Sequence, residues 1–190
     1  NEQEADRIGI KTLARANFDP RSMPAFFEKL QQASRYYGAG APEFLRTHPI
    51  TASRISDTRG RAETYPYRQV PDSQAYRLVK AKLRASSTQA QLPDLINYFQ
   101  NAANQGTQEQ RAAMQYGLGL TYIKQQNFSL AEKLFQQLKI RFPKQREYQT
   151  ALAQVALHKQ DFATAKKRYL ALQQTFPGNV EFQFAYIDIL

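Results

Sequence analysis

The sequence LGLTYIKQQNFSLAEKLFQQLKIRFP at residues 118–143 is followed, 34 positions later, by LAQVALHKQDFATAKKRYLALQQTFP at residues 152–177. The two segments align without a gap and share apolar, small and proline positions. The matched pairs include Leu118 with Leu152, Phe128 with Phe162, Ala131 with Ala165, Phe135 with Tyr169, Phe142 with Phe176, and Pro143 with Pro177. Self-similarity at a fixed period of this length is typical of stacked helical-hairpin repeats.

The small and aromatic positions of this repeat have a clear packing role. Gly119 and Ala131 let the two helices of a hairpin approach closely, Phe135 fills the space between hairpins, and Pro143 ends the second helix. The pattern Leu118-Gly119, Tyr122, Ala131, Phe135 and Pro143 resembles the tetratricopeptide repeat. We therefore expect repeats over residues 112–145 and 146–179 and a third from residue 180, within a repeat region of 106–190. The departures are Gln115 and Gln149 at the usual tryptophan position, and Ala156 in place of Tyr122.

Helix signals also dominate outside the repeats, and strand signals are almost missing, so we expect an all-α fold. Residues 73–105 have helical spacing without the repeat residues, which predicts an atypical capping hairpin. Residues 65–72 contain two prolines, which predicts a linker that follows a first domain at residues 1–64. Within that domain we expect helices over 2–16, from Asp19-Pro20 to about 36, and over about 51–62. The first of these is expected to bury one apolar face, made of Ala5, Ile8, Leu13 and Ala16.

Two sequence patterns predict capping boxes at helix starts. In a capping box the side chain of the cap residue accepts a hydrogen bond from the backbone N–H three residues later, and the side chain of that later residue accepts one from the backbone N–H of the cap. One pairs Thr107 with Gln110, and the other pairs Ser129 with Glu132.

The composition excludes several classes of protein and site. The 190 residues include no cysteine, so disulfides, thiolate nucleophiles and zinc fingers are ruled out. No apolar run approaches the roughly 18 residues of a membrane-spanning helix, so no transmembrane segment is predicted. The net charge is +10, and residues 71–190 contribute +7 of it, from 15 basic and 8 acidic side chains. This charge favours acidic protein partners or peripheral contact with an anionic membrane, because no nucleic-acid motif supports a sequence-specific nucleic-acid partner.

The first residues carry the pattern Glu2-x-x-Ala5-Asp6, which alone reads as acidic residues favouring the first turn of a helix. It is followed in order by Phe18-Asp19-Pro20, Phe26-Phe27-Glu28-Lys29-Leu30, Thr47-His48-Pro49 and Arg54-Ile55. This order resembles the C-terminal part of the catalytic domain of HtpX-like and CAAX-prenyl-protease-like zinc metallopeptidases. With tetratricopeptide repeats downstream, it resembles the beta-barrel assembly-enhancing protease group of the bacterial periplasm.

The resemblance implies a zinc site and a role for four residues. Glu2 would be a metal ligand, together with two histidines of a His-Glu-x-x-His helix, and Asp6 would orient a ligand histidine. His48 would be an additional, reversible ligand that keeps the enzyme latent, and Arg54 would lie near the same site. The alternatives are an exposed loop histidine for His48 and an ordinary surface ion pair for Arg54.

The chain departs from this family in one decisive respect, because it has no His-Glu-x-x-His and its two histidines are His48 and His158. Two ligands, Glu2 and His48, cannot complete a catalytic zinc site, so we expect the chain itself to be inactive. Since it begins at Asn1 rather than at methionine and stops within an apolar helical pattern, we expect it to be a piece of a longer protein. The resemblance implies that the parent cleaves misassembled outer-membrane proteins and that its repeats bind the assembly machinery or client proteins. The alternative is a non-enzymatic repeat adaptor.

Repeat arrays of this kind bind extended segments of their partners on the face lined by the first helix of each hairpin. The candidate binding residues in this register are Tyr116, Leu120, Lys124, Thr150, Gln154 and His158.

Overall fold

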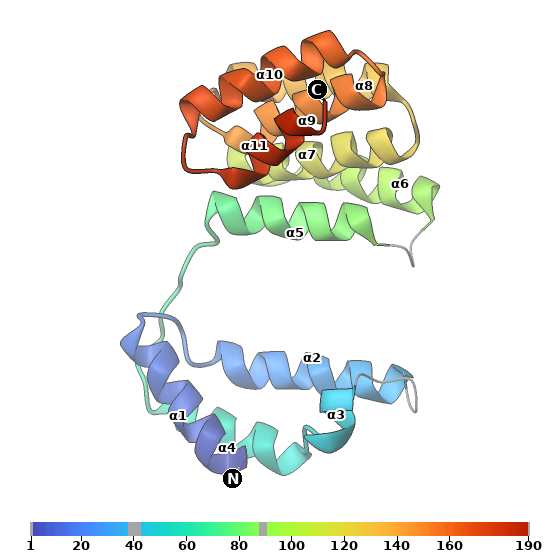
Figure 1. Cartoon of the computed structure of the whole chain (residues 1–190). Coiled ribbons are helices and arrows are strands. Elements are labelled where there is room, and N and C mark those ends of the chain that lie inside the picture. Colours follow the sequence, from blue (N-terminus) through green and yellow to red (C-terminus); the bar gives the residue numbers. More distant parts are fainter. Residues whose placement is uncertain (1, 38–42, 88–90, 190) are drawn as a thin grey trace. The chain divides into compact units, whose positions relative to one another are not determined.

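The computed structural model describes residues 2–37, 43–87 and 91–189, and these residues form helices connected by turns and loops, with no strand among them. The expected all-α fold is confirmed. The chain divides into two compact units, residues 1–71 and 72–190, which are described separately below. Figure 1 shows the helices of each unit. Within the described residues, none of the helices combines the length and apolar character needed to span a bilayer.

The first unit is built around α4. It contains α1 (Glu2–Arg15), α2 (Ser22–Tyr37), α3 (Glu43–Thr47) and α4 (Ala52–Glu63), and both α1 and α2 pack against α4. Among the described residues of this unit, the buried apolar side chains are Ile10, Pro20, Pro24, Phe27, Ile55 and Ala62. These are few buried apolar side chains for a unit of this size. Polar contacts between the helices therefore contribute a larger share of its stability.

The expected apolar face of the first helix is wrong. Ala5, Ile8 and Ala16 are exposed, whereas the residues of α1 that are buried are Asp6 and Ile10. The helix is rotated from the expected orientation because Asp6 faces α4, where a charged partner compensates the cost of burying its carboxylate.

The second unit consists of helical hairpins. The helices are α5 (Gln74–Ser86), α6 (Leu92–Ala102), α7 (Gln108–Lys124), α8 (Phe128–Arg141), α9 (Arg146–His158), α10 (Phe162–Thr175) and α11 (Val180–Ile187). Successive helices from α6 to α11 pack against one another, and α5 packs on α7 (Figure 1).

The turn inside each full repeat has the same backbone geometry. Gln126 and Gln160, 34 positions apart, have φ angles of 63° and 59°, in the left-handed region that ends helices. The next residue, Asn127 or Asp161, then accepts a backbone N–H with its side chain and caps the second helix of the hairpin. The capping box expected at Ser129 is therefore wrong, because α8 begins at Phe128 and its cap is Asn127. The box at Thr107 and Gln110 is confirmed.

Glycines in α7 allow the close helix contacts that the sequence predicts. A Cβ atom added at Gly119 would lie 2.5 Å from Cζ of Phe135, and one added at Gly117 would lie 2.2 Å from Cε1 of Phe99. Both rings are fully buried, so one continuous core runs from α5 to α9.

Candidate metal-site edge and repeat groove

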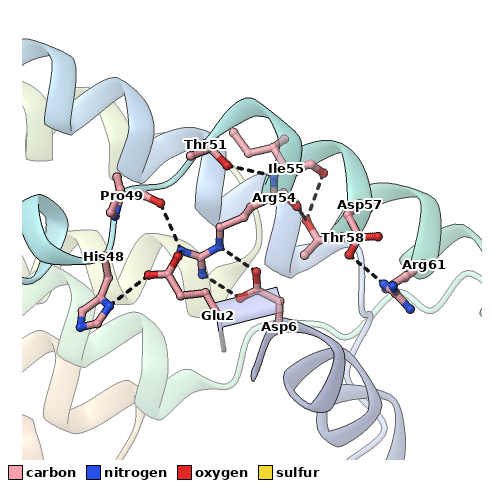
Figure 2. A network of polar contacts seen from close by, with 10 residues as sticks. All are labelled: Glu2, Asp6, His48, Pro49, Thr51, Arg54, Ile55, Asp57, Thr58 and Arg61. Carbon is pink, nitrogen blue, oxygen red and sulfur yellow. Dashed lines mark hydrogen bonds and ion pairs between the residues drawn. The ribbon is translucent and has the colours of Figure 1, made fainter. Parts of the chain in front are cut away.

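The N-terminus of α4 positions an arginine toward α1. The hydroxyl of Thr51 accepts a hydrogen bond of 3.2 Å from the backbone N–H of Arg54 and caps the helix. From this first turn, Nε and Nη2 of Arg54 donate to the two carboxylate oxygens of Asp6, each over 2.8 Å. Figure 2 shows this two-pronged pairing, which matches the planar guanidinium to the planar carboxylate.

The Arg54–Asp6 pair is largely buried, unlike an ordinary surface ion pair. The side chains are 12% and 5% exposed, and the guanidinium lies 5.1 Å from the centre of the Phe27 ring. The hydrogen bonds from Arg54 to Asp6 raise the pKa of Arg54, against the opposing effect of burial. Arg54 therefore stays charged in the folded unit.

Glu2 and His48 extend this network toward solvent. The carboxylate of Glu2 lies 3.3 Å from Nη1 of Arg54 and 3.0 Å from Nδ1 of His48. Nη1 also donates to the carbonyl of Pro49 over 3.2 Å, which ties the loop after α3 to α4 (Figure 2). Glu2 and Asp6 share one face of α1 because they are one helical turn apart. The structure thus brings together all four residues singled out in the first unit, and His48 remains 69% exposed.

The donor set at Glu2 and His48 fits part of a zinc site. Two ligands of a tetrahedral zinc ion lie about 3.3 Å apart for metal–ligand bonds of about 2.0 Å, which is close to the 3.0 Å between the Glu2 oxygen and the His48 nitrogen. In the part of the chain that the structure describes, no group of three or more His, Cys, Asp or Glu residues could hold a metal ion. The two donors fit as one edge of a site rather than as a complete one.

The second unit contains a groove at the predicted partner-binding face. Its volume is about 660 Å³, and it is lined by four of the six candidate residues together with others from α5, α7 and the start of α8. The four are Leu120, Lys124, Gln154 and His158. The His158 ring stacks on Phe128 with 5.8 Å between ring centres.

Two candidates differ from these four. Tyr116 is only 5% exposed and packs against Phe135 and Tyr148, so its assignment as a surface binding residue is wrong. Its position in the repeat faces the next hairpin, where its ring lies 5.7 Å from the ring of Tyr148 on α9. Thr150 is partly buried outside the groove lining, and its hydroxyl donates to the carbonyl of Arg146.

Three supporting residues of the network were not predicted as site residues: the cap Thr51, the Phe27 ring and the Pro49 carbonyl. Phe27 and Pro49 belong to the sequence patterns quoted above, but their contacts with Arg54 depend on tertiary packing. For the cap, a local signal existed in the sequence, because Thr51 stands at the start of the expected helix.

The two units of the chain match two different protein families. Residues 1–62 match the family model described as peptidase family M48, and residues 116–180 match that of the tetratricopeptide repeat. The chain is similar to named proteases of this organisation. The beta-barrel assembly-enhancing protease of Escherichia coli (strain K12) is 41% identical over 141 residues, which are 73% of this chain and 28% of the relative.

Two further relatives have the same relationship to the chain. The beta-barrel assembly-enhancing protease of Yersinia pestis is 36% identical over 146 residues, 75% of this chain and 29% of the relative. A Vibrio cholerae relative is 34% identical over 155 residues, 82% of this chain and 32% of the relative. The expected resemblance to a fragment of such a protease is confirmed, and the chain spans about 30% of the length of the curated relatives it matches.

Proposed function

We propose that this chain supplies one zinc ligand, Glu2, and the polar network behind it to a zinc metalloendopeptidase. The observation that carries the proposal is the grouping of Glu2, Asp6, His48 and Arg54 within the residues matched by peptidase family M48. The remaining ligands would come from a His-Glu-x-x-His helix elsewhere in the parent protein. The chain alone, with two donors, is not expected to cleave peptides.

Glu2 would bind the metal through the carboxylate that now contacts Arg54 and His48. A bound zinc ion supplies a water molecule of lowered pKa and polarises a peptide carbonyl. Arg54 would act as a positioning residue, because its contacts with Asp6 and Glu2 fix the first turn of α1 against α4. Each Asp6 oxygen accepts one hydrogen bond from Arg54 and keeps a second lone pair, which leaves capacity to orient a ligand histidine.

His48 would regulate access to this metal. Its ring nitrogen lies 3.0 Å from the Glu2 carboxylate, within reach of a metal bound by that carboxylate, while its side chain remains 69% exposed. An exposed residue on the loop after α3 can leave without disturbing a core. These two features support reversible ligation by His48, which would keep the enzyme latent until the loop moves.

The repeats would bind protein partners of the protease. The groove lined by Leu120, Lys124, Gln154 and His158 gives an extended segment apolar and basic contacts. By the names of the relatives, we propose that these partners are the outer-membrane assembly machinery and its client proteins, and that the enzyme works in the periplasm in outer-membrane protein quality control. The basic repeat unit also supports peripheral contact with an anionic membrane surface.

The test begins with the gene upstream of Asn1, where the proposal requires a His-Glu-x-x-His motif. In the protein encoded by that gene, Glu2→Gln is expected to abolish bound zinc, measured by elemental analysis, and cleavage of an unfolded protein substrate. Glu4→Gln is the matched control, because Glu4 lies in the same helical turn and pairs with Arg7 rather than with the network. Full zinc content and cleavage in the Glu2→Gln protein would overturn the ligand assignment. If the upstream motif is also missing, the chain belongs to a non-enzymatic repeat adaptor.

A further inference from the structure

A second groove in the repeat unit is separate from the one described above. Helices α5 and α6 both pack on α7 and make few contacts with each other. The space between them is a groove of about 470 Å³. Its lining includes Ala81 of α5, Phe99 of α6 and Met114 of α7, together with the ring of Tyr98 at the edge of α6. Ala81 and Phe99 are buried and Met114 is partly buried, so they form its floor.

The rim of this groove is basic on the α5 side. Arg77, Lys80 and Arg84 follow one another at spacings of three and four residues, which places them along one face of the helix. The guanidinium of Arg84 lies 3.7 Å from the centre of the Tyr98 ring on α6, so this cation spans the groove. Among the described residues, none of the three cations forms an ion pair with a carboxylate, although Asp72 belongs to the lining.

We propose that this α5–α6 groove binds a short acidic segment of a partner protein, with an aromatic or aliphatic side chain on the floor and a neighbouring carboxylate on the rim. Guanidinium groups pair with carboxylates through two parallel hydrogen bonds. The rim also carries Asp72, and Glu109 interacts electrostatically with Arg77, but three cations leave an excess of positive charge that favours an acidic segment. The floor selects for an apolar residue, and the volume lies in the range of ordinary ligand sites.

A peptide can contact the apolar floor, the basic rim and the remaining polar residues of the groove at the same time. The side chains of Gln105 and Gln110 and the backbone at Gly106 also lie along it and provide polar groups suited to a peptide backbone. A phosphate headgroup would use the cations alone and leave the apolar floor uncovered. The site is independent of the proposed metal site, since it shares no residue with the Glu2 network or with the groove lined by Leu120 and His158.

The proposal can be tested with the full chain and a fluorescein-labelled peptide, Ser-Gly-Asp-Phe-Glu-Leu-Gly-Ser, by fluorescence anisotropy. Removing two rim charges with Lys80→Gln and Arg84→Gln is expected to weaken binding by about tenfold or more, the loss of one or two charge-assisted hydrogen bonds. Lys133→Gln with Lys139→Gln removes the same charge from exposed positions on α8 and is expected to leave binding unchanged. Replacing Phe and Leu of the peptide by Ala is also expected to abolish binding, a test that leaves the protein unaltered.

Three outcomes would overturn the proposal. The first is failure of the wild-type chain to bind the peptide. The second is equal weakening in the groove and control variants, both shown to be folded by circular dichroism, which would indicate nonspecific charge attraction. The third is binding of phosphatidylglycerol vesicles that depends on Lys80 and Arg84 while the peptide does not bind, which would assign the groove to anionic lipid.

Discussion

Arg54 connects three segments of the first unit that are far apart in the sequence. Its guanidinium contacts Asp6 and Glu2 on α1, the Pro49 carbonyl in the loop after α3, and the face of Phe27 on α2. A lysine has no planar fork and could satisfy only part of this set. The stability of the first unit is therefore expected to depend strongly on this one side chain.

Arg54→Lys is expected to destabilise the first unit by about 2 kcal/mol, because the buried carboxylate of Asp6 loses its two-pronged partner. The free energy of unfolding is measured by urea titration, with hydrogen exchange of α1 and α4 as the readout. Arg59→Lys is the control, since Arg59 pairs with Glu28 at the surface and is 58% exposed; a change below about 0.5 kcal/mol is expected there. Equal effects of the two substitutions would contradict the structural weight given to Arg54.

Tyr148 predicts an alkaline limit to the stability of the repeats. The residue is fully buried in the core of the repeat unit, and its burial raises the pKa from the usual 10.0 to about 12. Because the folded pKa lies above the unfolded one, this stabilisation is complete below pH 10 and is lost as the pH rises toward 12. The loss for this group is expected to be on the order of 2 kcal/mol at the upper end.

The measurement is the urea midpoint of the repeat unit at a series of pH values. Tyr148→Phe is expected to make the decline between pH 10 and 12 shallower, while Tyr116 and Tyr169, whose pKa values burial also raises, maintain the remainder. Tyr76→Phe, at a position 51% exposed on α5, is expected to leave the decline unchanged. An identical decline in all three proteins would show that Tyr148 does not control it.

At the scale of helices, the α7 glycines set the distance between neighbouring elements. Alanine is the better helix former by about 1 kcal/mol, but at Gly117 its Cβ would lie 2.2 Å from the buried Phe99 ring. We expect the clash to prevail, with Gly117→Ala destabilising the repeat unit by about 1–3 kcal/mol. At Gly60 in α4 no atom lies within 4 Å of an added Cβ, so Gly60→Ala is expected to stabilise the first unit by about 0.5–1 kcal/mol. Thermal denaturation of both variants distinguishes the two cases, and stabilisation by Gly117→Ala would contradict the packing argument.

Features of the helices that depend on local sequence were predicted correctly, whereas features that depend on tertiary contacts were not. The 34-residue period predicted the repeat hairpins and the small residue Gly119 in α7, because the spacing of residues along a helix is a local property. It did not single out Gly117, whose neighbour Phe99 lies on α6. The apolar spacing within residues 2–16 misplaced the buried face of α1, because Asp6 is buried through a partner 48 positions away in the sequence. The capping-box pattern placed the cap of α8 at Ser129 instead of Asn127. The turn before Asn127 has a positive φ at Gln126, and a positive φ at a residue other than glycine leaves no clear signal in the sequence.

The candidate sites divide in the same way. The motif order drew attention to Glu2, Asp6, His48 and Arg54, and the structure groups them, but their degree of burial came from the packing of three helices. Tyr116 was assigned to the surface because repeat register alone does not tell a groove from an interface between hairpins. The α5–α6 groove had no sequence signal, since it arises from two helices that pack on a third instead of on each other.

At the scale of the whole chain, the two units differ in how their stability is built. The repeat unit has a continuous apolar core from α5 to α9, whereas the first unit buries few apolar side chains and relies on the Arg54–Asp6 pair. Small units bury a lower fraction of their surface and gain less from apolar burial. The two units are therefore expected to unfold in separate transitions, with residues 1–71 unfolding first.

This order can be measured by hydrogen exchange with mass spectrometry across a urea series, which assigns each transition to its own peptides. Arg54→Lys is expected to lower only the midpoint of α1, α2 and α4, and Gly117→Ala only that of α5 to α10, because the network and the glycine contact each lie inside one unit. A single transition shared by all helices, or a shift of both midpoints by either substitution, would show that the units stabilise each other. Separate transitions would mean that whatever completes the Glu2 site can stabilise the first unit without changing the docking surface of the repeats, since ligand binding stabilises only the unit that holds it.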